Sequence, residues 1–200
     1  MKLSITPLIL CSMFFLVKAN AQTKIVGECA VQYLIIQEQD TIGSKKVFIK
    51  GDQCKTVLST KQLTQTLYFN KQDSLASITK EMGNTKFLQQ VRFPQTTLVK
   101  VQSVVEGNNA DSLSMLGYAC KETQVMMSDS SYYQVWYTPQ LATTVNTFES
   151  IFENIPGLVL SYTVFPMKGK PIQYIAINID LSPIALSQFY INKENFQLID

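Results

Sequence analysis

Histidine is absent from this 200-residue sequence, and its absence excludes several kinds of active site. Without imidazole there is no Ser–His or Cys–His nucleophilic catalysis, no histidine general base and no histidine-ligated zinc site. Glycine-rich phosphate loops and the strand-to-helix turn of a nucleophilic serine are also missing. Carboxylate catalysis is left, but Glu149 and Glu153 stand one helical turn apart, which is typical of a solvated helix face. The sequence therefore predicts a protein that is not an enzyme and that holds no cofactor or metal.

Positive charge is also scarce, because Arg92 is the only arginine and no basic run occurs. The chain has 17 Lys and Arg against 15 Asp and Glu, which is a net charge of +2. Lys2 and Lys18 lie in the first 21 residues, so residues 22–200 carry equal numbers of basic and acidic side chains. A nucleic-acid-binding protein needs Lys and Arg to neutralise phosphates, so this class of partner is excluded.

Long apolar runs occur only near the first residues: 22–200 contain no stretch approaching the roughly 18–20 apolar residues that span a bilayer. Residues 1–21 have the pattern of a secretory signal peptide, with Lys2, an apolar segment from Ile5 to Val17, and the small-x-small site Ala19-Asn20-Ala21. Cleavage before Gln22 would leave one domain, residues 22–200, without a transmembrane segment. We therefore expect a periplasmic or secreted protein.

The alternative to secretion is a lipoprotein that is anchored in the membrane through an acylated Cys11. A lipoprotein cysteine follows a small residue, whereas Leu10 is bulky, and the apolar run continues past Cys11 to Val17. Ordinary cleavage at Ala21 is therefore expected, and a lipoprotein anchored through Cys11 is not.

Most of residues 22–200 alternate between apolar and polar side chains, which predicts half-buried β-strands. One face of the first strand collects its apolar residues, namely Ile25, Cys29, Val31, Tyr33 and Ile35. Asp40-Thr41-Ile42-Gly43 has the composition of a turn, and Gly51-Asp52 predicts a bulge or a sharp bend within the next strand. The further strands are expected at 45–58, 64–70, 74–82, 86–93, 98–106, 113–127, 131–137, 158–165, 171–181 and 195–199.

One segment has a helical period instead. Its apolar residues recur at spacings of three and four, at Leu141, Val145, Phe148, Phe152 and Ile155. This stripe predicts an amphipathic helix that ends at Pro156-Gly157, where Gly would adopt the left-handed cap conformation. A short helical turn is expected at 184–188. The fold class is therefore mainly β (α+β): an antiparallel sheet long enough to curl, with a helix lying against it.

Cys29, Cys54 and Cys120 lie within residues 22–200, and an oxidising compartment favours pairing. If the first turn centres between Thr41 and Ile42, Cys29 and Cys54 face each other across two strands, within disulfide reach. A bulge at Gly51-Asp52 would change this register, and Cys54 with Cys120 is the alternative pair. The third alternative is that all three cysteines are small buried hydrophobic residues.

Three strings in the second half of the chain occur in a fixed order: Gly117-Tyr118-Ala119-Cys120-Lys121, then Gln134-Val135-Trp136-Tyr137-Thr138-Pro139, then Ile155-Pro156-Gly157-Leu158-Val159-Leu160. This order resembles the secreted Bacteroidetes proteins of the GLPGLI type and related families of unknown function. In those proteins a Gly-Tyr-x-Cys-Lys strand precedes a Val-Trp-Tyr-Thr strand, and a Leu-Pro-Gly-Leu segment begins the next. Ile155 stands here in place of the first Leu of that last motif.

The resemblance implies the fold of the lipoprotein carriers of the Gram-negative periplasm. That fold is a strongly curved antiparallel sheet, an incomplete barrel, with one or two helices packed on its concave side. We therefore expect an exported envelope protein that binds a lipid or another apolar ligand between sheet and helix. Its walls would come from Trp136, Phe148, Phe152, Leu158, Leu160, Ile175 and Ile177. The same residues would equally fill a core, which makes the alternative an interaction module of the envelope with a protein partner and no ligand.

Overall fold

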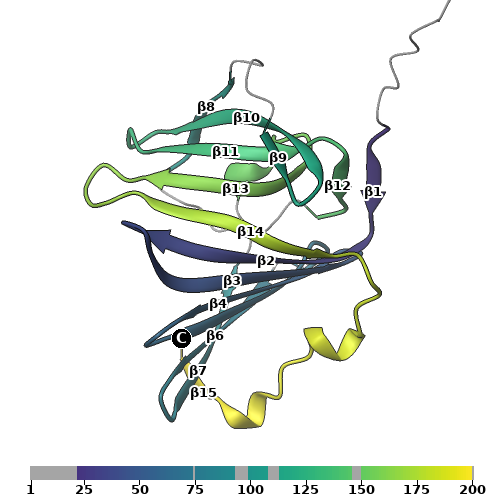
Figure 1. The fold of residues 1–200 in the computed structure, drawn as a ribbon. Helices are drawn as coiled ribbons and strands as arrows, with labels where there is room; N and C mark the ends of the chain where they lie inside the picture. The colour runs from purple at the N-terminus through teal and green to yellow at the C-terminus, as the bar shows by residue number, and fades with distance from the viewer. Residues whose placement is uncertain (1–21, 74, 93–98, 108–112, 146–149, 200) are drawn as a thin grey trace, which may run out of the picture.

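The structure, a computed structural model, describes residues 22–73, 75–92, 99–107, 113–145 and 150–199 (Figure 1). One large sheet dominates it, and its strands are β2 (Glu28–Gln37), β3 (Asp40–Lys50), β4 (Gln53–Thr60), β5 (Thr64–Asn70), β6 (Leu75–Met82), β7 (Thr85–Arg92), β8 (Val101–Glu106), β9 (Leu113–Met115), β10 (Tyr118–Met127), β11 (Tyr132–Thr138), β13 (Leu158–Phe165), β14 (Ile172–Asp180) and β15 (Gln197–Ile199).

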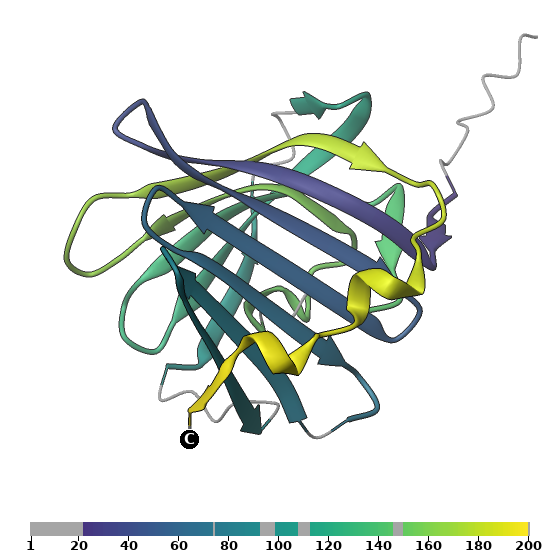
Figure 2. The same ribbon diagram turned by 90° about the horizontal axis from the view of Figure 1, so that it is seen from below.

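The sheet follows the order β15-β7-β6-β5-β4-β3-β2-β14-β13-β11-β10-β8, with β9 pairing β10 outside this path. Its pairs are antiparallel except β15 with β7, so the sheet is mixed, and it is not closed. It twists and curls, so that strands β2–β7 and strands β8–β11, β13 and β14 form two parts of one curved surface (Figures 1 and 2). The mainly β, largely antiparallel architecture expected from the alternating pattern is confirmed.

Two smaller pieces complete the described fold. β1 (Lys24–Val26) pairs in parallel with β12 (Leu141–Thr143) as a separate two-stranded sheet. Three short 3₁₀ turns follow in the chain, η1 (Ser150–Phe152), η2 (Leu186–Phe189) and η3 (Lys193–Asn195). The last two belong to the segment of residues 181–196 between β14 and β15, which we call the strap.

Alternate residues of β2 and β3 form the centre of the core. Val31 pairs with Val47 and Cys29 with Ile49, and all four are almost completely buried on the inner face of the sheet. They belong to a first core cluster that extends through Cys54, Leu67 and Phe69 to Leu158 and Leu160. A second cluster, around Val125, Val135, Phe152, Val159 and Tyr162, lies against β10, β11 and β13. Tyr174 on β14 packs against both clusters.

The helix expected from Leu141 to Ile155 is not formed as expected. Leu141 begins strand β12 instead, because the backbone there pairs with β1, and the Lys24 amide donates to the Gln140 carbonyl at 2.8 Å. Ser150–Phe152 is a single 3₁₀ turn, and Phe148 lies outside the described residues. Leu141, Val145, Phe152 and Ile155 are nevertheless buried, so the apolar spacing marked contact with the core rather than a helical backbone. Helices packed on the concave side are therefore not shown within the described ranges.

Gly157 also differs from expectation, since it does not have the left-handed conformation of a helix cap. A Cβ atom there would lie 2.2 Å from the carbonyl oxygen of Thr138, so Gly157 is required by the close approach of its backbone to β11.

Three turns of the sheet differ from those that the sequence predicted. Glu38 and Gln39 form the first turn, with φ of 51° and 77°, in place of Asp40–Gly43. Gly51 and Asp52 form a complete turn between β3 and β4, where a bulge or a sharp bend within one strand was expected, so 45–58 is not one strand. Leu116 and Gly117, both with positive φ, likewise divide 113–127 into β9 and β10.

No helix among the described residues is long and apolar enough to span a membrane. The expected signal peptide, residues 1–21, and Cys11 within it lie outside the described residues.

Candidate functional site

The strap crosses the outer face of the sheet, opposite the core, from the start of β2 to β7, where it leads into the edge strand β15 (Figure 2). At its first end the Ile184 amide donates to Glu28 Oε2 at 2.8 Å, while Glu28 Oε1 forms an ion pair with Lys50 Nζ at 2.7 Å. These bonds, the one to Lys50 first, lower the pKa of Glu28 below its usual 4.5. At its other end the strap leads into β15, and Lys86 Nζ lies 5.9 Å from the Phe196 ring. Both ends of the strap are therefore tied to the sheet.

Beneath the strap, the outer face carries a row of side chains that the strand register places side by side. Phe48, Lys55, Tyr68 and Ser77 are successive partners on β3, β4, β5 and β6. Lys55 Nζ lies 5.6 Å from the Phe48 ring and 5.3 Å from the Tyr68 ring, which is cation–π geometry. Burial lowers the pKa of Lys55, and burial together with the charge of Glu81 raises the pKa of Tyr68. The Tyr68 hydroxyl therefore remains protonated at neutral pH and can donate a hydrogen bond.

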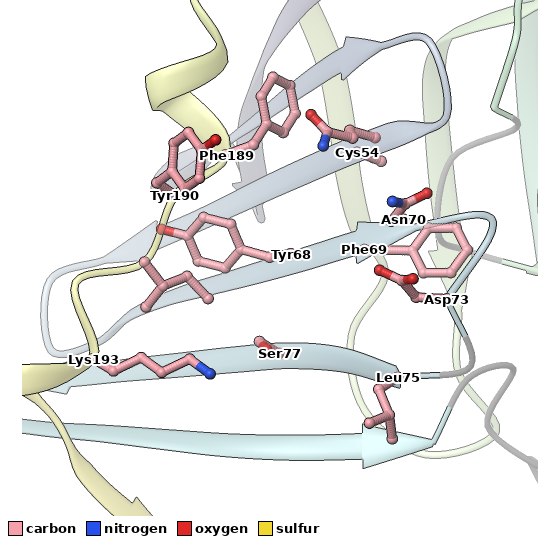
Figure 3. Close-up of a pocket in the computed structure, with 12 residues that line it drawn as sticks. Cys54, Tyr68, Phe69, Asn70, Asp73, Leu75, Ser77, Phe189, Tyr190 and Lys193 are labelled. Carbon is pink, nitrogen blue, oxygen red and sulfur yellow. The ribbon is translucent and has the colours of Figure 1, made fainter.

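A pocket of about 290 Å³ lies between this outer face and the strap (Figure 3). The strap contributes Phe189, Tyr190, Ile191 and Lys193 to its walls. The sheet and its β5–β6 turn contribute Gln53, Cys54, Tyr68, Phe69, Asn70, Asp73, Leu75 and Ser77. Alternation sends Tyr68 to this outer face and its neighbour Phe69 into the first core cluster. The pocket thus combines aromatic rings from both sides with amide, hydroxyl and carboxyl groups.

Hydrogen bonds between two turns hold the polar end of the pocket. Asn70 Oδ1 accepts from the Gln72 amide at 3.1 Å, and the Asp73 amide donates to the Asn70 carbonyl at 3.0 Å. Gln72 Nε2 donates to Asp52 Oδ2 at 2.7 Å, and the Lys71 amide donates to the Asp52 carbonyl at 2.9 Å. The β3–β4 turn and the β5–β6 turn are therefore joined, which fixes Asn70 in place.

Gln53, also in the lining, has a side-chain oxygen with no exposed surface and no hydrogen-bond partner. Leaving a buried acceptor without a donor costs about 1–3 kcal/mol, and native proteins contain few such groups. The oxygen has no exposed surface as it lies, so a ligand hydroxyl or amide would supply the missing donor only once the Gln53 side chain turned toward the pocket.

A second hollow, of about 600 Å³, is open and lies where the β2–β3 and β4–β5 turns meet. Its lining contains Gln37, Asp40, Thr41, Ile42, Thr60, Lys61 and Gln62. Its lining contains no aromatic ring, so it offers a ligand less apolar contact than the pocket beneath the strap does.

The side chains expected to form an apolar ligand site lie at several depths. Phe152, Leu158 and Leu160 are buried, with exposed fractions of 4%, 3% and 0%. Trp136 is partly buried against the first core cluster. Ile175 is partly buried, and Ile177 is 43% exposed at a bulge of β14. Phe148 lies outside the described residues. Phe152 belongs to the second cluster and the two leucines to the first, so the structure does not gather these residues at one point.

A buried lysine among tyrosines is a feature that sequence reasoning missed. Lys45 is only 4% exposed, and its Nζ donates to Tyr162 Oη at 3.0 Å. The same Nζ lies 5.7, 5.2 and 5.7 Å from the rings of Tyr33, Tyr162 and Tyr174. Tyr33 Oη donates to the Val159 carbonyl at 2.7 Å. This cluster fastens β2 and β3 to β13, and its signal in the sequence was a lysine on the otherwise apolar face of β3.

Cys29, Cys54 and Cys120, the cysteines of the described residues, form no disulfide. Cys29 and Cys54 both pair with Ile49, from opposite sides, so strand β3 lies between them. Two strand spacings are about 9.6 Å, beyond the 4.4–6.8 Å Cα separation of a disulfide. The 29–54 pairing was wrong because the hairpin turns at Glu38–Gln39, three residues before the expected centre. Burial, with a smaller effect of a charged Cys54, raises the pKa of Cys29 to about 12.

No protein-family model matches this chain, and neither does any curated protein. The resemblance to the GLPGLI-type proteins therefore stays an expectation from the three sequence strings. Within the described ranges no group of three or more Cys, Asp or Glu side chains is placed to hold a metal ion.

Proposed function

We propose that this protein is a non-enzymatic binding protein of the cell envelope, and that its ligand occupies the pocket between the strap and the outer face of β4–β6. The observation that carries the proposal is a pocket with aromatic walls on both sides, one of whose lining residues, Gln53, has a buried oxygen without a hydrogen-bond partner. Ligand pockets typically combine apolar walls with a few fixed polar groups. The joined turns hold Asn70, and the tied ends of the strap hold Phe189 and Tyr190.

Export supports the envelope location in this proposal. Export is expected from the signal-peptide pattern of residues 1–21. N-terminal sequencing of the purified protein tests it directly, and Gln22 is the expected first residue.

Two other functions keep a specific observation in their favour. The curved sheet with an apolar inner face supports the apolar-ligand site expected from the sequence. The burial of Phe152, Leu158 and Leu160 within the core clusters supports an interaction module without a ligand. Each function predicts a different result in one experiment.

That experiment is native mass spectrometry of the protein exported through its own signal peptide, compared with two variants. Ser77→Phe places a ring in the pocket. Gln90→Phe, its matched control, places the same ring on the same row of the outer face, one strand farther along and outside the pocket lining. We expect a co-purifying adduct in the wild type and in Gln90→Phe that is lost in Ser77→Phe. A lipid-sized adduct present in all three would indicate the inner face, and no adduct in any would favour the interaction module.

A further inference from the structure

We infer that the ligand of the pocket beneath the strap is a neutral saccharide of one or a few sugar rings; the inference rests on the proposed function and specifies its ligand. A sugar ring has two chemical requirements that few other ligands combine. Its C–H faces are apolar and stack on flat aromatic rings, and its hydroxyl groups at the ring edge need both donors and acceptors.

The aromatic requirement is met from two elements. Tyr68 projects from β5, and Phe189 and Tyr190 come from the strap that faces it (Figure 3). Tyr190 is 78% exposed, which is unusual for a large aromatic side chain that lines a pocket. An exposed ring beside a pocket is available to stack on a ligand, and stacking would remove its apolar surface from water.

The polar requirement is met by uncharged groups at the side of the sheet. Gln53, Asn70 and Ser77 line the pocket, and the buried Gln53 oxygen has no donor of its own. A hydroxyl is the donor that a saccharide offers in quantity. The Tyr68 hydroxyl, kept protonated by its raised pKa, can donate in return.

The charge and the polarity of the lining disfavour the main competing ligands. Asp73 and Lys193 are the charged residues of the lining and have opposite signs, so the pocket favours neither an anion nor a cation. The volume of about 290 Å³ lies just below the usual range of ligand pockets, which suits a small ligand. The mixed polar lining lacks the continuous apolar wall that an acyl chain requires.

The test uses the full exported chain with defined probes: the neutral trisaccharides maltotriose, cellotriose, mannotriose and chitotriose, with trigalacturonate and palmitate as charged and apolar controls. Binding is measured by saturation-transfer NMR and titration calorimetry. We expect at least one neutral trisaccharide to bind and both controls to fail.

Two variants test the geometry of binding. Tyr190→Ala should weaken saccharide binding by about tenfold, whereas Leu186→Ala, on the same strap, 56% exposed and outside the lining, should leave binding unchanged. Gln53→Met should also weaken binding, yet it should raise the melting temperature of the empty protein because it removes an unsatisfied buried oxygen. If Gln53 had only a structural role, Gln53→Met would change the saccharide affinity and the melting temperature in the same direction.

The possible failures are distinguishable. If no neutral trisaccharide binds while Ser77→Phe still removes a native adduct, the saccharide is wrong and the binding pocket stands. Saccharide binding that survives both Ser77→Phe and Tyr190→Ala would overturn the location. Absence of both an adduct and any binding would overturn the proposed function itself.

Discussion

The three cysteines show how far a side chain's chemistry depends on its neighbours across the sheet. Cys29, Cys54 and Cys120 are all buried, with exposed fractions of 0%, 1% and 3%, in the first core cluster. Burial raises the pKa of Cys29 to about 12 and also raises that of Cys120, so their reactive thiolates are scarce at neutral pH. These thiols therefore behave as small core residues.

We accordingly expect the folded protein to resist iodoacetamide at pH 8, where a thiol with a pKa of about 12 is almost wholly protonated. In guanidinium chloride without reductant, all three cysteines of residues 22–200 should be carbamidomethylated, as read by intact mass. A mass gain of one label instead of three would show that a disulfide exists in spite of β3.

Leu160 and Ile177 allow a matched test of the residues expected to bind an apolar ligand. Leu160 is fully buried, so Leu160→Ala should lower the free energy of unfolding by about 2–5 kcal/mol. Ile177 is 43% exposed at the β14 bulge, so Ile177→Ala should change it by less than about 0.5 kcal/mol. Urea denaturation measures both. Equal effects would mean that Ile177 is covered by something in solution.

At the scale of the element, the segment that leads into β13 depends on a close backbone approach. Gly157 lies so near Thr138 that an added Cβ would meet the carbonyl oxygen at 2.2 Å and the carbonyl carbon at 2.8 Å. Backbone atoms cannot rotate away as a side chain can, so the strand itself would have to move. The Pro-Gly string that resembles a family motif thus has a packing reason in this chain.

Gly157→Ala should therefore lower the free energy of unfolding by about 1–3 kcal/mol or more. Gly27→Ala is its control, because nothing lies within 4 Å of a Cβ at Gly27, and its effect should stay within about 0.5 kcal/mol. Thermal or urea unfolding of the two variants gives the comparison. A harmless Gly157→Ala would contradict the register of β11 with β13.

The strap should loosen at its first end in acid. The pKa of Glu28 is lowered in the folded state, so the bonds of its carboxylate to Lys50 and Ile184 contribute stability above pH 4.5. That contribution is lost as the pH falls below 4.5 through the folded-state value. We expect the Ile184 amide resonance to move in this range, and the stability difference between wild type and Glu28→Gln to shrink there.

The neighbouring Ser182 amide provides an internal reference for this titration. It donates to Asp180, whose pKa is also lowered, chiefly by this bond. In Glu28→Gln the Ser182 resonance should still titrate while that of Ile184 no longer does. Titration of Ile184 in the variant would mean that Glu28 does not hold the strap.

At the scale of the whole molecule, one sheet and one shared residue join the two core clusters. β2 and β14 pair over seven residue pairs in the middle of the sheet, and Tyr174 packs against both clusters. The Lys45–Tyr162 bond crosses the same boundary. Neither half of the sheet can therefore separate without exposing apolar surface of the other.

The described domain should accordingly unfold in one cooperative transition. Trp136 packs against the first cluster, so its fluorescence should change at the same urea concentration as the far-ultraviolet circular dichroism of the strands. Two separate midpoints would mean that the clusters are independent units.

The alternation of apolar and polar residues by itself determined that this chain is a mainly β protein. It also determined which side chains of β2 are buried in the core. Cys29, Val31, Tyr33 and Ile35 are buried as their spacing indicates, because a strand alternates its faces whatever it pairs with. Ile25, assigned to the same face, lies in the separate strand β1 and is 75% exposed.

Only the tertiary structure decided where the chain turns and what the strap covers. The turn at Glu38–Gln39 uses left-handed residues that are not glycine, and the bulge at Ile177 shifts the faces of β14, so local composition pointed elsewhere. The Leu141–Ile155 spacing fits a helix, but pairing with β1 made its first residues a strand. The pocket joins residues of β4–β6 to residues more than a hundred positions later, and distance along the chain hides such a site from any local pattern.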